Sequence, residues 1–577
     1  MTSTLADLVK AKVLTPGTVR LARHLGFLYS EEDELVVMAT ACTITSLSAG
    51  SVCFDIRHPS RLMVDLESEM SITWPDSDDW ETRLRNSPLV STDLSARDRG
   101  LILDSGLLYL TRYWAEQQQV VEWASTRILP KTKDLNPWLD IYFSGKYAVQ
   151  KQAAQIVTES SFCVLAGGPG TGKTTVVARI LAALSQNRQE PLRVILTAPT
   201  GRAAARLGEA VREELASCQA IPEMEISVHY ESNTLHKVLG IKPWGAVDYN
   251  STHPLPADLV VVDEASMLSL HLMTLLLDAL SDETKLLLVG DPDQLTSVEA
   301  GAVLADIVAS GSSIPVARLT VNHRFCEQIA SLADAIRLGQ STRAIQILEE
   351  ADPQGPITWI PRDLDSGSSK TLEVVRSEIV NDQLRLMEAA QSSKIEQALA
   401  ALDSHRLLLA HRHGLTGVAH WTQVVQQWLR AHHSQIGSSR WYEGMPVLIT
   451  KNEDHLSVYN GDYGVIVPTD DGLQLAIRDS NGYSLRSPDM IQSCEPLYCS
   501  TIHKAQGSQF DRVTVMLPHT SAAILTRELL YTAVTRAKTQ LRIIGSSETI
   551  EQAVCSPALR ASGLTSKLAE GVPRTNA

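Results

Sequence analysis

The sequence predicts an α/β protein with two lobes, each built around a parallel β-sheet, and three observations carry that prediction. From about residue 145, short uninterrupted apolar runs alternate with helical patterns, which is typical of a parallel sheet covered on both faces. A second series of this kind begins near residue 405. Between its strands lies a β-rich block in which Asn460-Gly461 is a strong type I′ hairpin signal. The strand candidates are 162–166, 193–198, 258–263, 285–290 and 315–319 in the first lobe, and 406–411, 513–517 and 541–545 in the second.

The N-terminal part of the chain carries helical patterns and one hairpin, with Asp104-Ser105-Gly106 as its turn. It shows no catalytic constellation, so we expect a mainly helical docking or scaffold domain. The stretch Leu35 to Phe54 has no charged residue, and its Thr, Ser and Gly content favours a buried helix running into a strand over a membrane span. The predicted boundaries are 1–140 for this domain, 141–345 for the first lobe, 346–439 and 496–568 for the two parts of the second lobe, 440–495 for its β-barrel-like insertion and 569–577 for a disordered tail.

Composition narrows the class of protein. A length of 577 residues fits about three to four domains, and 44% apolar with 20% charged residues is ordinary for a globular protein. The net charge of −15 argues against an isolated polybasic nucleic-acid binder, although a basic groove on an acidic body remains open. Eight scattered cysteines form no C-x-x-C pair, and the N-terminus lacks a signal pattern. We therefore expect a cytoplasmic protein without a zinc site, a disulfide framework or a membrane segment.

The segment GGPGTGKTT at 167–175 follows a predicted strand and opens a predicted helix. It fits the pattern G-x-x-x-x-G-K-[ST], in which glycines let consecutive backbone N–H groups point at phosphate oxygens. Lys173 is expected to reach the β- and γ-phosphates of ATP, and the Thr174 hydroxyl to hold Mg²⁺. The predicted nucleotide-binding residues are Gly168, Pro169, Gly170, Thr171, Gly172, Lys173, Thr174 and Thr175.

Five further residues are candidates for the hydrolysis chemistry. Asp263 and Glu264 end an apolar strand; Asp263 is expected to bind Mg²⁺, and Glu264 to polarise the attacking water. Gln294 lies in a polar turn after the next strand, as a γ-phosphate sensor or water positioner. Arg324 and Arg536 are candidate stabilisers of transition-state charge. Taken singly, these residues are more often helix caps, turns or solvated arginines. If Arg536 comes from the second lobe, ATP lies between the lobes and its hydrolysis can open and close the cleft.

The order of these motifs resembles superfamily 1 helicases. The segments TAPTGRAAARL, TLHKVLG, NHRF, STIHKAQGSQFDRVTVMLP and RELLYTAVTRAK narrow the resemblance to the RecD family, the α subunits of bacterial RecBCD exodeoxyribonuclease V complexes. That resemblance implies two RecA-like P-loop NTPase lobes, an SH3-like insertion and an N-terminal domain that docks on a partner. It also places Gln150 as an adenine-recognising glutamine.

The function that the resemblance implies is an ATP- and Mg²⁺-dependent 5′→3′ DNA helicase. Such a motor acts on the single-stranded 5′ tail at double-strand ends. It works with RecB-like and RecC-like subunits in a heterotrimer that unwinds and degrades DNA for recombinational repair, with the nuclease in a partner subunit. Two alternatives stay open: a solitary RecD-like helicase, and an ATP-gated regulatory subunit of a nuclease complex.

A translocating motor needs DNA contacts that ignore sequence, namely hydroxyls and cations on phosphates, and rings on bases. Each candidate, taken alone, is nearly as well explained as a helix cap or a solvated side chain. Aromatic residues of the insertion are expected mainly in its core; they are Trp441, Tyr442, Tyr459 and Tyr463. The candidate DNA contacts are Thr200, Arg202, Thr234 and His236 in the first lobe and Thr501, His503 and Lys504 in the second.

Overall fold

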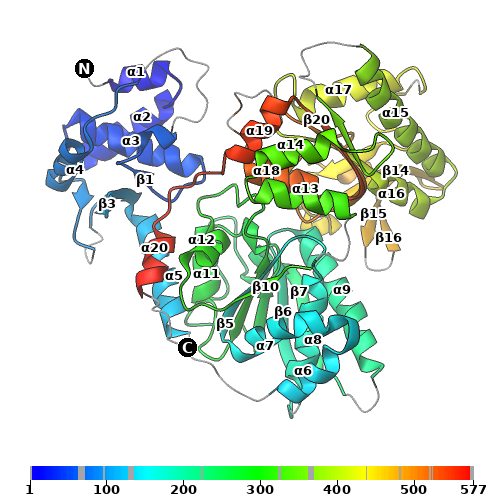
Figure 1. The fold of residues 1–577 in the computed structure, drawn as a ribbon, viewed down its shortest axis with the longest axis horizontal. Coiled ribbons are helices and arrows are strands. Elements are labelled where there is room, and N and C mark those ends of the chain that lie inside the picture. Colours follow the sequence, from blue (N-terminus) through cyan, green and yellow to red (C-terminus); the bar gives the residue numbers. More distant parts are fainter. Residues whose placement is uncertain are drawn as a thin grey trace.

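The computed structural model describes residues 3–62, 72–94, 98–127, 135–186, 188–221, 225–321, 326–361, 369–433, 435–436, 438–479, 482–518, 522 and 524–571. Figure 1 shows three bodies: an N-terminal domain in blue, a first lobe in cyan and green, and a second lobe in yellow, orange and light green.

The N-terminal domain packs four helices against a small four-stranded sheet of order β1-β4-β3-β2. Helix α3 is almost wholly buried and runs into β1, which confirms the prediction for 35–54. The hairpin turn between β3 and β4 has positive φ at Ser105 and Gly106, as a type I′ turn requires. No helix in the described ranges is long and apolar enough to cross a membrane. The elements are α1 (Leu5–Lys10), α2 (Pro16–Leu28), α3 (Glu34–Ser48), β1 (Phe54–Asp55), η1 (Pro59–Leu62), α4 (Ser77–Asn86), β2 (Val90–Ser91), β3 (Leu101–Asp104) and β4 (Leu107–Leu110).

The first lobe is a six-stranded parallel sheet of order β10-β5-β9-β8-β6-β7. Its strands are β5 (Phe162–Gly167), β6 (Leu192–Ala198), β7 (Val228–Thr234), β8 (Leu259–Val262), β9 (Lys285–Gly290) and β10 (Val316–Leu319). Its helices are α5 (Thr111–Thr126), α6 (Asn136–Tyr142), η2 (Gly145–Gln150), α7 (Lys151–Glu159), α8 (Lys173–Ser185), α9 (Gly201–Gln219), α10 (Leu235–Val238), η3 (Ala265–Met267), α11 (Leu270–Asp278) and α12 (Val303–Ser310).

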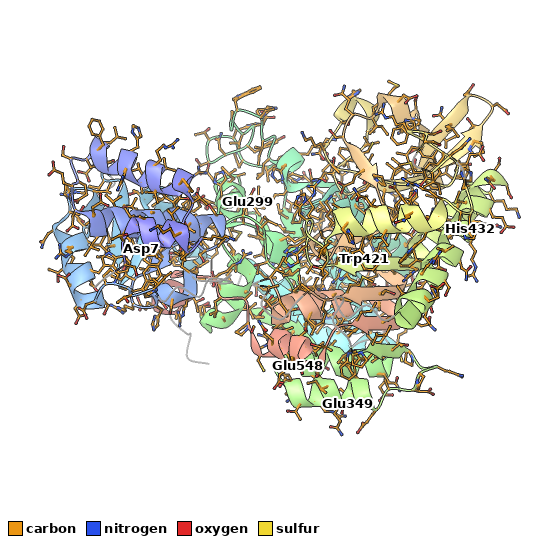
Figure 2. The ribbon with its side chains drawn as sticks, turned by 90° about the horizontal axis from the view of Figure 1, so that it is seen from above. Asp7, Glu299, Glu349, Trp421, His432 and Glu548 are labelled. Atoms are coloured by element: carbon orange, nitrogen blue, oxygen red, sulfur yellow. The ribbon has the colours of Figure 1, made fainter. Side chains whose placement is uncertain are left out.

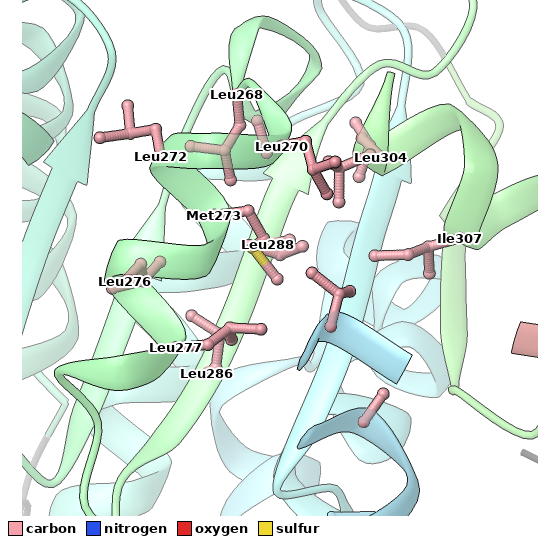
Figure 3. Packing of buried hydrophobic residues seen from close by; sticks show 14 of the residues in the cluster. Leu268, Leu270, Leu272, Met273, Leu276, Leu277, Leu286, Leu288, Leu304 and Ile307 are labelled. Atoms are coloured by element: carbon pink, nitrogen blue, oxygen red, sulfur yellow. The ribbon is translucent and has the colours of Figure 1, made fainter. Parts of the chain in front are cut away.

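Both faces of this sheet are buried, and the strand sequences explain why. In β8, Val260 and Val262 join the core under α11 and α12, whereas Leu259 and Val261 join the core under α7, α8 and α9. Figure 3 shows the first of these cores, where leucines of α11 and α12 meet those of β9. Strands with two buried faces need apolar residues at every position, so the uninterrupted runs in the sequence are a reliable signal.

The second lobe is a five-stranded parallel sheet of order β11-β20-β19-β12-β18. Its strands are β11 (Ile357–Ile360), β12 (His405–Leu409), β18 (Ser500–Thr501), β19 (Phe510–Met516) and β20 (Ala537–Ile544). Its helices are α13 (Glu327–Arg337), α14 (Ser341–Glu349), α15 (Ser369–Gln391), α16 (Ile395–Ser404), α17 (Val418–Leu429), η6 (His503–Ala505), α18 (Arg527–Val534) and α19 (Ser547–Cys555).

The limit of 1–140 predicted for the N-terminal domain is wrong, because α5 and α6 pack in the two cores of the first lobe. The boundary between the lobes also differs from the predicted position at 345. Ile329, Leu332 and Ile336 of α13 share a core with β19, β20, α18 and α19, so α13 and α14 lie with the second lobe. The apolar face of an amphipathic helix indicates that the helix packs on a sheet, but it does not identify the sheet. The prediction from the sequence therefore assigned these two helices to the wrong lobe.

The insertion is a five-stranded antiparallel sheet of order β16-β15-β14-β13-β17. Among the described residues, its edge strands β16 and β17 form no ladder with each other, so the sheet is open and a barrel-like closure is not confirmed. Only Gly461 has a positive φ in the Asn460-Gly461 turn, so the expected type I′ hairpin is wrong and the turn belongs to a longer loop. The elements are β13 (Pro446–Ile449), η4 (Asp454–Leu456), β14 (Tyr463–Thr469), β15 (Gly472–Asp479), β16 (Gly482–Arg486), η5 (Pro488–Met490) and β17 (Cys494–Pro496).

The C-terminal segment, residues 556–571, returns from the second lobe to the first. Its helix α20 (Leu564–Gly571) packs against α5 and α12, and Leu564 and Leu568 are part of the first-lobe core. The sequence assigns 496–568 to the second lobe and 569–577 to a disordered tail; the structure corrects both, except that 572–577 lie outside the described residues. In the view of Figure 2, Glu299 of the first lobe lies between the N-terminal domain, marked by Asp7, and the second lobe, marked by Trp421.

Candidate functional site

The glycine-rich loop joins the C-terminal end of β5 to the start of α8. Gly170 and Gly172 have φ values of 83° and 84°, a backbone region that L side chains rarely adopt. Gly172 directly precedes the helix. The Lys173 ammonium donates hydrogen bonds to the carbonyl oxygens of Gly167 at 2.7 Å and Gly168 at 3.0 Å. The loop therefore curls around the lysine at the positive end of a helix, which is an anion-binding arrangement.

Two carboxylates lie at the end of β8, which β9 separates from β5 in the sheet. Glu264 has a φ of 50°, unusual for a residue with a side chain, and its N–H donates to Asp263 Oδ1 at 2.9 Å. Burial, together with the nearby charge of Glu264, raises the pKa of Asp263 to about 6, and Lys173 opposes this effect. A half-buried carboxylate pair of this kind is stabilised by a cation.

Arg536 follows α18 of the second lobe and is only 2% exposed. Its guanidinium donates to Gln294 Oε1 at 2.8 Å and to the Ser508 carbonyl oxygen at 3.1 Å. Gln294 in turn donates to Asp291 Oδ2 at 2.9 Å, and Tyr531 of the second lobe donates to the same oxygen at 3.0 Å. Burial lowers the pKa of the Arg536 guanidinium. A buried hydrogen-bond network thus joins the two lobes beside the glycine-rich loop.

Side chains of both lobes line one cavity beside the glycine-rich loop. Lys173 and Arg536 line it together, as the sequence predicts for a nucleotide held between the lobes. Six of its lining residues are absent from the predicted set, and two of these, Arg206 and Gln509, have polar side chains. Arg206 lies one helical turn after Arg202 on α9 and donates to the Gly507 carbonyl oxygen across the cleft at 3.0 Å. The lining residues are Pro169, Gly170, Gly172, Lys173, Thr174, Thr175, Ala203, Arg206, Leu207, Ala210, Asp263, Glu264, Gln294, Gly507, Gln509 and Arg536.

Gln150 is buried against the glycine-rich loop. Its amide donates to the Thr171 carbonyl oxygen at 3.3 Å, and a side chain added at Gly172 would meet that amide at 2.7 Å. Its Oε1 has no hydrogen-bond partner among the described residues. Gln150 therefore contacts the loop that binds phosphate, and adenine recognition by its free oxygen stays a prediction. Arg324 falls in 322–325, outside the described residues.

A second cavity of about 850 Å³ lies between α9, the end of β7 and the insertion. Of the predicted DNA contacts, Arg202 and Thr234 line it, and Tyr459 and Tyr463 of the insertion face it. We call this cavity the groove. Its basic lining residues are Arg202, Arg206, Arg212, Lys237, Arg478 and Arg486.

Several predicted DNA contacts have local structural roles. The hydroxyls of Thr200 and Thr234 cap α9 and α10 by accepting backbone N–H groups at 3.3 Å. In the second lobe, Lys504 pairs with Glu495 and its N–H donates to Thr501 Oγ1. Burial and the nearby Arg560 lower the pKa of His503. Within the described lining of the groove, the structure does not include His236, Thr501, His503 or Lys504.

The aromatic residues of the insertion divide into two groups. Tyr442 is 1% exposed and belongs to a hydrophobic core, which confirms the prediction for that residue. The Trp441 indole N–H donates to Asp489 at 2.8 Å. Tyr459 lines the groove, where the sequence favoured a core position. Tyr463 also lines the groove, but it packs against two hydrophobic cores as well, which agrees with the prediction.

Three family models match separate parts of the chain. They are the N-terminal domain of RecBCD enzyme subunit RecD at residues 10–109, an AAA domain at 147–358 and a UvrD-like helicase C-terminal domain at 496–544. Among solved structures, a Pif1 helicase from Bacteroides in complex with ADP-AlF3 and ssDNA matches with a TM-score of 0.39 and 17% identity, covering 70% of this chain and 92% of that one.

Curated relatives match over nearly the full length. The chain is 41% identical over 565 residues to RecBCD enzyme subunit RecD of Mycolicibacterium smegmatis, covering 97% of this chain and 98% of that protein. It is 30% identical over 646 residues to RecBCD enzyme subunit RecD of Haemophilus influenzae, covering 98% and 99%. By this similarity along its whole length, the chain belongs to the RecD family of RecBCD enzyme subunits.

Proposed function

We propose that this chain is an ATP-dependent DNA helicase, the motor subunit of a RecBCD-like complex that acts on double-strand DNA ends in the bacterial cytoplasm. The observation that carries the proposal is the cavity that Lys173 of the first lobe and Arg536 of the second lobe share. A nucleotide held there contacts both lobes, so its binding and hydrolysis can change the angle between them.

The hydrolysis chemistry follows from the groups in that cavity. Backbone N–H groups of the glycine-rich loop and the Lys173 ammonium bind the phosphates. Glu264 orients a water molecule for in-line attack on the γ-phosphorus and accepts its proton, while the bond to the β-phosphate oxygen breaks. The Arg536 guanidinium stabilises the charge that develops on the γ-phosphoryl oxygens, and Gln294 holds that guanidinium in place.

The residues present fit a magnesium ion. Thr174 and Asp263 both bring oxygen ligands to the cavity, and a cation bound there would offset the burial that raises the pKa of Asp263. Mg²⁺ usually keeps waters and phosphate oxygens among its ligands, so two protein ligands are sufficient for such a site. Bound there, Mg²⁺ neutralises charge on the phosphates.

Besides the bonds of Arg536 and Tyr531, three more hydrogen bonds couple the cleft to the second lobe. The Leu295 N–H donates to Thr532 Oγ1 at 2.9 Å, and Gln506 donates to the Leu295 carbonyl oxygen at 2.7 Å. Arg206 adds its bond to Gly507. The helix that carries Arg206 also carries Arg202, which lines the groove. A change at the nucleotide is therefore transmitted along α9 to the groove.

We assign the groove as part of the DNA path. Its lining combines cations from both lobes with tyrosine rings, which suits a polynucleotide held by its phosphates and bases irrespective of sequence. On this proposal the strand is the single-stranded 5′ tail and translocation runs 5′→3′. RecB-like and RecC-like subunits are the proposed partners, and the N-terminal domain is the proposed docking surface for them.

The first test is Lys173→Ala in the complex purified with its partner subunits. We expect DNA-stimulated ATP hydrolysis to fall by on the order of 10²- to 10³-fold, because the variant has one phosphate-binding cation fewer. Lys242→Ala, an exposed first-lobe lysine paired with Asp248, is the matched control and should retain full activity. Undiminished hydrolysis by Lys173→Ala would refute the site.

Strand displacement tests polarity and partnership. With the nuclease and the partner motor inactivated, duplexes with a 5′ tail should be unwound and duplexes with a 3′ tail should not. Preference for the 3′ tail contradicts the proposed direction. Recovery of the native protein as a free monomer contradicts its role as a complex subunit.

A further inference from the structure

Arg202, which the sequence predicts as a DNA-phosphate contact, already has partners within the chain. Its guanidinium carbon lies 3.8 Å from the centre of the Tyr463 ring, and its Nη2 lies 3.7 Å from Asp403 Oδ1. Arg202 belongs to α9 of the first lobe, whereas Asp403 and Tyr463 belong to the second lobe and its insertion. These contacts therefore span the groove.

Asp403 is held in position by the insertion. Its carboxylate accepts hydrogen bonds from the Tyr463 hydroxyl and from Arg478 Nε, the latter at 3.0 Å. The side chains of Arg202 and Asp403 are 32% and 28% exposed, so water and solutes can reach the pair. The geometry therefore allows Arg202 and Asp403 to pair, and their exposure allows a phosphate from solution to replace Asp403.

A second contact crosses the groove beside the first. Lys237 of α10 donates to the Tyr459 hydroxyl at 3.4 Å, and its ammonium lies 5.4 Å from the centre of that ring. Gly201 allows this approach, because a Cβ there would lie 3.0 Å from Tyr459 Cβ. The first lobe and the insertion are thus joined by two cations, each engaged by a tyrosine.

We propose that Asp403 competes with DNA phosphate for Arg202 and so occupies this cation when no strand is bound. This inference rests on the proposed DNA path. A carboxylate and a phosphate present oxygen pairs of similar geometry to a guanidinium, so one can replace the other. A DNA strand that enters the groove must displace Asp403 from Arg202. When the strand leaves, Asp403 pairs with Arg202 again. Competition between Asp403 and phosphate weakens the contact of Arg202 with DNA and favours release of the strand. A translocating motor requires such release at every step.

A double-mutant cycle on the purified complex tests the competition. Binding of a fluorescent oligo-dT strand is measured by anisotropy at a fixed salt concentration for Asp403→Asn, Arg202→Ala and the double variant. We expect Asp403→Asn to bind about two- to fivefold more tightly, because an exposed ion pair no longer opposes binding. Arg202→Ala should bind roughly tenfold more weakly. In a salt series, its log–log slope should be shallower by about 0.7 for each phosphate that Arg202 neutralises in the unmodified chain. The gain from Asp403→Asn should disappear in the double variant.

Glu209→Gln is the matched control. Glu209 also lines the groove and lies two turns from Arg202 on α9, so its neutralisation removes the same charge without touching the pair. A gain from Asp403→Asn that equals that of Glu209→Gln, or that persists with Arg202→Ala, overturns the competition. Melting curves verify folding, and Asp403→Ser should give the same gain through a different side chain.

The same experiment separates this inference from the proposed function. If Arg202→Ala binds DNA as tightly as the unmodified chain, the groove is not the DNA path and that part of the proposed function fails. If Arg202→Ala weakens binding while Asp403→Asn leaves it unchanged, the path stands and only the competition fails.

Discussion

The cleft and the groove both join the two lobes, but they are built from different kinds of contact. In the cleft, Arg536, Gln294 and Asp291 are each at most 3% exposed and are hydrogen-bonded in a chain. In the groove, Arg202 and Asp403 are about one-third exposed. Charge stabilisation in a transition state is strongest where water is excluded. A site that binds and releases a strand repeatedly needs contacts that water can replace. The exposure of the charged side chains therefore distinguishes the cleft, where ATP is hydrolysed, from the groove, where DNA moves.

The largest effect is expected for Arg536→Ala, which tests whether the buried arginine of the cleft acts in the transition state. We expect kcat for DNA-stimulated ATP hydrolysis to fall by on the order of 10³-fold, as when an arginine finger is removed, with ATP binding near normal. Arg536→Lys keeps the charge but not the fork that contacts Gln294 and Ser508, so most of the decrease should persist. Equal decreases in binding and turnover, measured by nucleotide titration and steady-state kinetics, would contradict a transition-state role.

A half-buried carboxylate away from both sites tests whether partial burial of a charge lowers the free energy of unfolding. Asp306 of α12 accepts hydrogen bonds from Ser562 and Thr565 of the C-terminal segment. Burial raises its pKa to about 6, although these two hydrogen bonds and Arg560 oppose the rise. Because the pKa is higher in the folded than in the unfolded chain, this group lowers the free energy of unfolding as pH rises from about 4 through 6.

Asp306→Asn should remove that dependence. Relative to the unmodified chain, we expect its free energy of unfolding to gain about 1 to 2 kcal/mol between pH 5 and pH 7.5. Denaturant titrations at the two pH values measure this difference, and Asp489→Asn on the surface is the control. A constant difference across the range shows that the Asp306 carboxyl ionises normally in the folded chain.

The smallest effect is expected from removing tyrosine hydroxyls, which compares a tyrosine of the hydrophobic core with a tyrosine of the groove. The Tyr442 hydroxyl is buried and has no hydrogen-bond partner among the described residues. Tyr442→Phe should raise the free energy of unfolding by up to about 1 kcal/mol and leave DNA affinity unchanged. Tyr459→Phe is the matched change on a groove ring and should leave stability unchanged. Weaker DNA binding by Tyr442→Phe would show that this ring is not purely structural.

The sequence predicted the strands with two buried faces well and the exposed edges poorly. The runs that became β5, β8 and β9 are apolar except for Lys285 at the start of β9, because helices cover both sides of them. The edge strand β7 has the sequence VHYESNT and no fully buried residue, so no apolar run marks it. The return of α20 to the first lobe was also missed, since an amphipathic helix does not identify its partner across several hundred residues.

The same limit applies to the site. Lys173, Asp263, Glu264 and Gln294 were found because motifs with fixed spacing place them at the ends of predicted strands. Arg536 was found mainly through the resemblance to superfamily 1 helicases. Arg206 was not found, because it enters the cavity only through the pitch of α9 and the approach of the second lobe. The pairing of Arg202 with Asp403 depends entirely on how the insertion sits over the first lobe.

The place of α20 has a consequence for biosynthesis. The core of the first lobe contains Leu564 and Leu568, although the last strand of that lobe, β10, ends at Leu319. A ribosome that adds roughly 5–20 residues per second needs on the order of tens of seconds to pass from one to the other. During that interval the nascent lobe exposes an apolar surface on α5 and α12, which a chaperone would have to shield until translation ends.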